Sequence, residues 1–108
     1  MSLNVYLEKF HLPRGIYSHN ITHNLNRMAD AAGIYYHLWQ PETLYIKTAG
    51  QLIEPLEQGL ARLLAYPFKY RRFNPANGWG KYEDLVNFVQ EYLAACKSDP
   101  NALVRASG

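Results

Sequence analysis

Cysteine is nearly absent from this chain, which contains one, Cys96, among 108 residues. A single cysteine cannot form an intrachain disulfide, and it excludes the paired Cys-x-x-Cys ligands of structural zinc sites. Chains without disulfides are typical of reducing compartments, so we expect a cytoplasmic protein. Cys96 falls on the apolar face of a predicted helix, where a free thiol is usually inert packing.

Long apolar runs and a strong excess of one charge are also lacking. No stretch approaches the ~20 apolar residues that cross a bilayer, and the N-terminus has no signal-peptide pattern, so we expect no membrane association. The formal net charge of +2 is too small on its own to indicate a polyanionic partner. The length and the 48% of hydrophobic residues are typical of a single globular domain over residues 1–108.

The pattern of apolar residues predicts helices and a short β element. Alternating side chains predict a strand over Asn4–Phe10, which Pro13-Arg14-Gly15 ends. Spacings of three and four predict three main helices: from Ser18 or Asn20 to Ala32, from about Thr48 to before Pro67, and from Lys81 to Lys97. Ile34–Trp39 is expected to form a short helical turn that Pro41 closes.

These elements define the predicted fold. A second strand is expected over Leu103–Ala106, and we expect it to pair with residues 4–10 and bring the termini together. Gly33 suits the position just after the first helix, while Pro55 should kink the second helix or mark a later start. The fold class is α+β and mostly α: three main helices, with a small two-stranded element formed by the N- and C-terminal segments.

Two groups of short runs stand out along the chain. The first is Asn20-Ile21-Thr22-His23-Asn24-Leu25, Met28-Ala29, Ala32-Gly33-Ile34-Tyr35 and Leu38-Trp39. The second is Asn77-Gly78-Trp79-Gly80, Tyr82-Glu83, Leu85-Val86, Phe88-Val89, Tyr92-Leu93 and Ala95-Cys96. Over about residues 18 to 106, these runs resemble a small family of uncharacterised bacterial and phage proteins. The family has no established activity, so the resemblance implies a free-standing domain encoded on phage or other mobile DNA, and no catalytic residues.

The first candidate site is the segment from His19 to Asn24. In the predicted first helix, His19 and His23 lie on one face with Arg27 and Asp30, opposite the apolar stripe. The simpler interpretation is a solvated face with an Arg27–Asp30 ion pair. The alternative is a site that another segment closes.

The His-x3-His spacing is also that of helical zinc sites, so His19, His23 and Asp30 are candidate metal ligands. His37 and His11 are further sources of a third ligand. Asn20 stands where a zincin has its general-base Glu, which excludes that class. The Asn20 and Asn24 amides lie nearer the core, where an amide tethers neighbouring backbone or, beside aromatic rings, recognises the edge of a base or a sugar.

The second candidate site is the aromatic and basic connector over residues 68–80. Its Tyr70, Arg71 and Trp79 are residue types that stack on rings and bind phosphates. The simpler interpretation is that Phe68, Phe73 and Trp79 fill the gap between two helices while the cations are solvated. After the connector, Glu83 and Asp84 are expected to cap the last helix.

Three functional hypotheses follow. The leading one is a small cytoplasmic binding or interaction domain, phage-derived, whose ligand-binding residues are His19, Asn20, His23, Asn24, Arg27, Tyr70, Arg71 and Trp79. The clustered rings of Tyr35, Tyr36 and Trp39 favour a homodimer or a protein partner. The alternative is a metal-dependent or nucleotide-directed enzyme that uses the His19/His23 face. A weaker alternative is a nucleic-acid-binding module using Lys69, Arg71 and Arg72, which lacks any RNP, KH or zinc-finger pattern.

Overall fold

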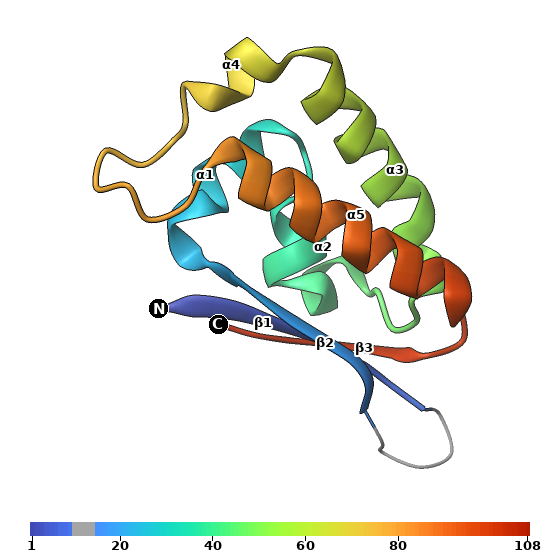
Figure 1. The fold of residues 1–108 in the computed structure, drawn as a ribbon. Helices are drawn as coiled ribbons and strands as arrows, with labels where there is room; N and C mark the ends of the chain where they lie inside the picture. Colours follow the sequence, from blue (N-terminus) through green and yellow to red (C-terminus); the bar gives the residue numbers. More distant parts are fainter. Residues whose placement is uncertain (10–14) are drawn as a thin grey trace.

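Two layers build the structure, a three-stranded antiparallel sheet and a set of helices that covers one of its faces (Figure 1). The structure is a computed structural model, and it describes residues 1–9 and 15–108. The strands are β1 (Ser2–Glu8), β2 (Gly15–Thr22) and β3 (Leu103–Ser107), in the order β2-β1-β3. The predicted α+β class is confirmed, and the sheet has one strand more than predicted because residues 15–22 are extended.

The central strand β1 supplies the apolar floor of the core. Its alternate residues Leu3, Val5 and Leu7 are fully buried, as expected for side chains that share the covered face of a sheet. The predicted pairing of the two terminal segments is confirmed, since β1 and β3 pair from Asn4↔Ser107 to Glu8↔Leu103. The two ends of the chain therefore lie close together (Figure 1). The end of the predicted first strand at Phe10, and the predicted break at residues 13–14, fall outside the described residues.

Two long helices and several short ones form the second layer. In chain order they are η1 (His23–Leu25), α1 (Asn26–Ala31), α2 (Tyr35–Trp39), η2 (Pro41–Leu44), α3 (Gly50–Ala65), α4 (Pro67–Arg71) and α5 (Tyr82–Ser98), where η marks a 3-10 turn. The long helices α3 and α5 pack on each other, and α5 also lies over β2. Both were predicted, and α3 continues through Pro55 instead of starting after it. None of the helices in the described residues is long and apolar enough to span a membrane.

The predicted start of the first helix is wrong. Residues 18–22 belong to β2, where Tyr17, His19 and Ile21 pair opposite Leu7, Val5 and Leu3 and so share the covered face of the sheet. The helical segment begins after Thr22, whose Oγ1 accepts a hydrogen bond from the Asn24 N–H at 3.4 Å. The expected end is confirmed, because Gly33 follows the helix with φ 81°.

Candidate functional site

The structure separates the two histidines of the first candidate site. His19, on β2, is half-buried against α5, with its Nε2 2.8 Å from Glu91 Oε2 and its ring centroid 5.1 Å from that of Phe88. His23 lies beyond the end of the strand, in η1. The predicted helical His-x3-His pair is therefore wrong, because the boundary at Thr22 puts the two side chains on different elements.

The metal hypothesis loses its basis with that pair. Within residues 1–9 and 15–108, no group of three or more His, Cys, Asp or Glu side chains could hold a metal ion. His11 lies outside the described residues. His37 is half-buried with an unpartnered Nδ1 among the described residues, and its pKa is lowered by burial and by the nearby Arg62.

His23 instead anchors the turn between β2 and α1 to α2. The indole Nε1–H of Trp39 donates to His23 Nδ1 at 3.0 Å. Because an indole can only donate, Nδ1 must be the unprotonated nitrogen, which leaves the proton of the neutral ring on Nε2. The atom 3.4 Å from Nε2 is Asn26 Nδ2, which is also a donor, so this pair forms a hydrogen bond only with the Asn26 amide turned to bring its oxygen to that place. The Trp39–His23 hydrogen bond thus fixes the His23 ring beside the start of α1.

The loop over residues 72–81 is fastened to the same turn. The Asn24 amide donates to the Trp79 carbonyl at 3.4 Å, as the tethering interpretation expected, but its side chain is exposed and so does not lie near the core as predicted. Gly80 has φ 106°, and a Cβ there would lie 2.7 Å from Thr22 Cγ2 and 3.0 Å from Leu25 Cγ. Glycine is needed at this position for both the backbone angle and the close approach.

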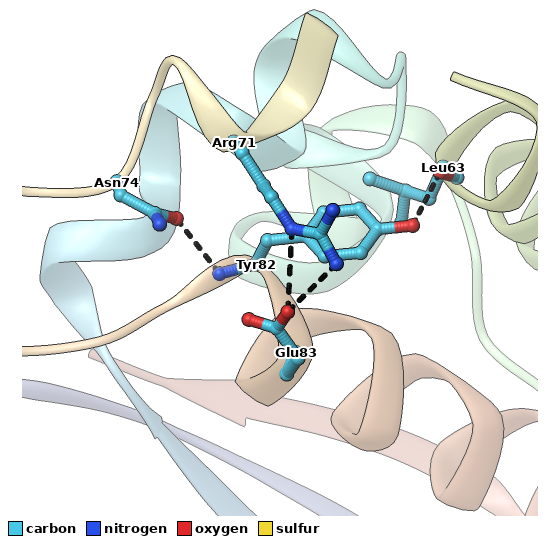
Figure 2. A network of polar contacts seen from close by, with 5 residues as sticks. All are labelled: Leu63, Arg71, Asn74, Tyr82 and Glu83. Atoms are coloured by element: carbon cyan, nitrogen blue, oxygen red, sulfur yellow. Dashed lines mark hydrogen bonds and ion pairs between the residues drawn. The ribbon is translucent and has the colours of Figure 1, made fainter. Parts of the chain in front are cut away.

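A second set of contacts holds the other end of the loop (Figure 2). Asn74 Oδ1 accepts a hydrogen bond from the Tyr82 N–H at 2.8 Å, and the Tyr82 hydroxyl donates to the Leu63 carbonyl at 2.6 Å. Arg71 pairs with Glu83 at 2.9 Å and lies over the Tyr82 ring. The predicted cap of α5 is confirmed, since Asp84 Oδ2 accepts from the Lys81 N–H at 2.9 Å. The segment that carries Arg72 and Phe73 is therefore fixed on both sides.

The aromatic residues of the connector are placed differently from the prediction. Tyr70, predicted to contact ligand, is 1% exposed and belongs to the hydrophobic core. Phe68, Phe73 and Trp79, which the simpler interpretation placed in the gap between two helices, are exposed, and Trp79 is 70% exposed. Periodicity could not separate these cases, because α4 is a single short helix followed by an irregular loop.

Between α1 and this loop lies a hollow of about 550 Å³, which we call the arginine hollow. It is lined by His23, Asn24, Asn26, Arg27, Arg72, Phe73 and the segment 74–76. Neither Arg27 nor Arg72 forms an ion pair with a described residue, so the predicted Arg27–Asp30 pair is wrong. No carboxylate of the described residues lines this hollow. The site therefore has two unneutralised guanidinium groups among amides.

A second hollow of about 480 Å³, the aromatic hollow, adjoins the first and shares three of its residues. It is lined by Asn26, Arg27, Asp30, Tyr35, Tyr36 and Phe73, with Ala31. The Tyr35 ring stacks on Trp39 at 5.4 Å and meets Tyr36 edge to face at 5.0 Å, so the Tyr35 ring is used in packing against its neighbours. Tyr36 remains 49% exposed.

The predicted ligand residues are thus divided among different places. His23, Asn24 and Arg27 line the arginine hollow. His19, Asn20 and Trp79 line a separate hollow of about 390 Å³, where the Asp84 and Glu91 carboxylates also lie. Tyr70 is buried and Arg71 is paired. The sequence reasoning missed Asn26, Phe73 and Asn74 as site residues, and it weighed Arg72 only for nucleic acid.

Comparisons of the chain with protein-family models, with curated proteins and with solved structures found no match. The geometry of the two adjoining hollows is consequently the basis of the functional argument.

Proposed function

We propose that this protein is a small binding domain that holds an anionic ligand in the arginine hollow. One observation carries the proposal: Arg27 and Arg72 come from different elements, line the same hollow, and have no ion-pair partner among the described residues. A guanidinium group presents several N–H donors in a planar fork that matches a carboxylate or a phosphate. Two such groups around one hollow favour a ligand of negative charge.

The other residues of the hollow support the same ligand chemistry. The Asn24, Asn26 and Asn74 side chains line it, and an amide NH₂ group can donate to the oxygens of an anion. Glu83 pairs with Arg71 and Asp84 caps α5, while the Asp30 carboxylate lines the adjoining hollow and not this one. An anion in the hollow would therefore meet donors and cations.

The fastening of the loop supports binding with little rearrangement. Asn74 is held by the Tyr82 N–H and Asn24 by the Trp79 carbonyl, so a residue on each side of the hollow is already held by a hydrogen bond before any ligand binds. Preorganisation of this kind reduces the entropy lost on binding. The alternative of an enzyme on the His19/His23 face is not supported in the same way, because the two histidines lie on different elements.

The proposal is tested by isothermal titration calorimetry with inorganic pyrophosphate, comparing the wild type with Arg27→Ala and Arg72→Ala. Loss of one charge-assisted hydrogen bond of about 1.5–3 kcal/mol predicts a roughly 10- to 150-fold weaker affinity in each variant. Lys69→Ala is the matched control, because it removes one positive charge from α4 outside the hollow. Binding that is absent in the wild type, or reduced equally by all three changes, contradicts the proposal.

We also propose a cytoplasmic location and a phage origin. Cys96, the one cysteine of the sequence, is free and buried, and a chain without disulfides suits a reducing compartment. The resemblance of the sequence to bacterial and phage proteins supports the phage origin. Fractionation of cells that express the untagged protein tests the location, and recovery with membranes or culture medium contradicts it.

A further inference from the structure

We propose that the anionic ligand is a guanine nucleotide, with its phosphate in the arginine hollow and its base in the aromatic hollow. This inference rests on the proposed function. The two hollows are neighbours, because Asn26, Arg27 and Phe73 line both of them. A ligand that fills both must have an anionic end and a planar end within one molecule.

The aromatic hollow suits a planar base. Phe73 and Tyr36 are 38% and 49% exposed, so each retains free ring surface beside the shared residues. Aromatic side chains bind bases by stacking, since every base has a π-face. The chain leaves these two rings partly uncovered, whereas the neighbouring Tyr35 ring is stacked on Trp39.

Asp30 determines which way the nucleotide lies in the two hollows and which base it carries. Its side chain lines the aromatic hollow and not the arginine hollow, and it has no ion-pair partner among the described residues. An ionised carboxylate only accepts hydrogen bonds and repels a phosphate, so the phosphate lies toward Arg27 and Arg72. Guanine offers two adjacent donors on its Watson–Crick edge, N1–H and the N2 amino group, which one carboxylate can accept together. Adenine offers only its N6 amino group on that edge.

Titrations monitored by heteronuclear NMR test this assignment, with GMP, AMP, guanosine and inorganic phosphate as separate probes. We expect GMP to bind at least tenfold more tightly than AMP, guanosine or phosphate, with backbone shifts at Asp30, Phe73 and Arg72. Asp30→Asn should abolish the preference for GMP over AMP and leave phosphate binding intact. Asp99→Asn, which makes the same change at the exposed end of α5, is the matched control and should keep the preference.

The rings are tested with Phe73→Ala and, because that change also alters the loop, with Tyr36→Ala on α2. Each should weaken GMP about tenfold without weakening phosphate, which corresponds to the loss of one stacking contact. A guanosine-containing pentanucleotide separates the two sources of this chemistry. Affinity equal to that of GMP assigns a free nucleotide, and a higher affinity assigns a nucleotide within a single strand.

The outcomes distinguish this inference from the proposed function. If phosphate binds and depends on Arg72 but GMP binds no more tightly, the nucleotide assignment is overturned and the anion site stands. Equal affinities for GMP and AMP likewise overturn the assignment to guanine. If neither phosphate nor GMP binds, both the inference and the proposed function are overturned.

Discussion

Replacing Tyr82 by Phe tests how the loop beside the arginine hollow is connected to the core. In a continuing helix the Leu63 carbonyl would accept the N–H of residue 67, which is Pro67 and has none. The helix α3 ends at Ala65, and the Tyr82 hydroxyl donates to the Leu63 carbonyl at 2.6 Å (Figure 2). The Tyr82 hydroxyl on α5 therefore supplies the donor that the Leu63 carbonyl on α3 would otherwise lack.

The expected cost follows from this geometry. Tyr82→Phe keeps the buried ring and its packing, so it adds no free-energy cost from a cavity. It does leave the Leu63 carbonyl without its donor. An unsatisfied buried polar group costs about 1–3 kcal/mol, and we expect the free energy of unfolding to fall by that amount. In a domain of this size, each kcal/mol corresponds to a fall of about 4–8 °C in Tm.

Urea denaturation measures this loss as a lower midpoint at unchanged slope. Tyr45→Phe is the matched control, because Tyr45 is 83% exposed and removal of its hydroxyl should change the free energy of unfolding by less than about 0.5 kcal/mol. If Tyr82→Phe is as stable as Tyr45→Phe, the hydroxyl does not satisfy the carbonyl and the reasoning fails.

Three further changes have definite expected outcomes. Gly59→Ala should destabilise the protein by about 1–3 kcal/mol despite the better helix propensity of Ala, because the new Cβ would clash with Cγ2 of the buried Ile34. An unchanged midpoint of urea unfolding would show that the Ile34 side chain moves aside without cost. Burial and the nearby Arg62 lower the pKa of His37 below its usual 6.5, so as the pH drops the unfolded chain takes up the proton first. The free energy of unfolding should therefore fall as the pH drops below about 6.5. His37→Gln should show a smaller fall between about pH 7 and 5.5, and an equal dependence of stability on pH in both proteins would contradict this. Burial raises the pKa of the Cys96 thiol to about 12, so it should react with Ellman's reagent only on unfolding in urea, and rapid reaction of the native protein would show that it is accessible.

The parts of the fold that sequence reasoning predicted are those whose local pattern and tertiary packing agree. In α5 the apolar residues recur at helical spacing, and the helix buries that same face against α3 and the sheet. The first strand is also consistent, since Leu3, Val5 and Leu7 alternate and lie on the covered face. In such segments the periodicity alone identifies both the element and its buried side.

The strand β2 was missed because Ile21 fits two patterns at once. It stands four residues before Leu25, as on a helical stripe, and two residues after His19, as on a strand. Pairing with β1 decides between them, and this contact between distant parts of the chain is not visible in local spacing. The wrong helix assignment also produced the wrong site, because His19 and His23 form a pair on one face only if residues 19–23 are helical.

The arginine hollow shows the same limit. Arg27 was a candidate from its place opposite the apolar stripe, and it lines the hollow. Arg72 and Asn74 lie in an irregular segment without periodicity, so their positions depend on single contacts such as the Asn74–Tyr82 hydrogen bond. Such contacts join residues whose separation in the sequence follows no helical or strand periodicity, so the sequence pattern does not predict them.

The central claim is that Arg27 and Arg72 form one anion-binding hollow. The most direct measurement is a map of backbone amide shifts in the ¹⁵N-labelled protein during titration with inorganic phosphate, at constant ionic strength. We expect saturable shifts at Arg27, Arg72 and Asn74 that disappear together in Arg72→Ala. Shifts that are absent, that do not saturate, or that centre on other cations such as Lys47 and Lys97 would contradict it.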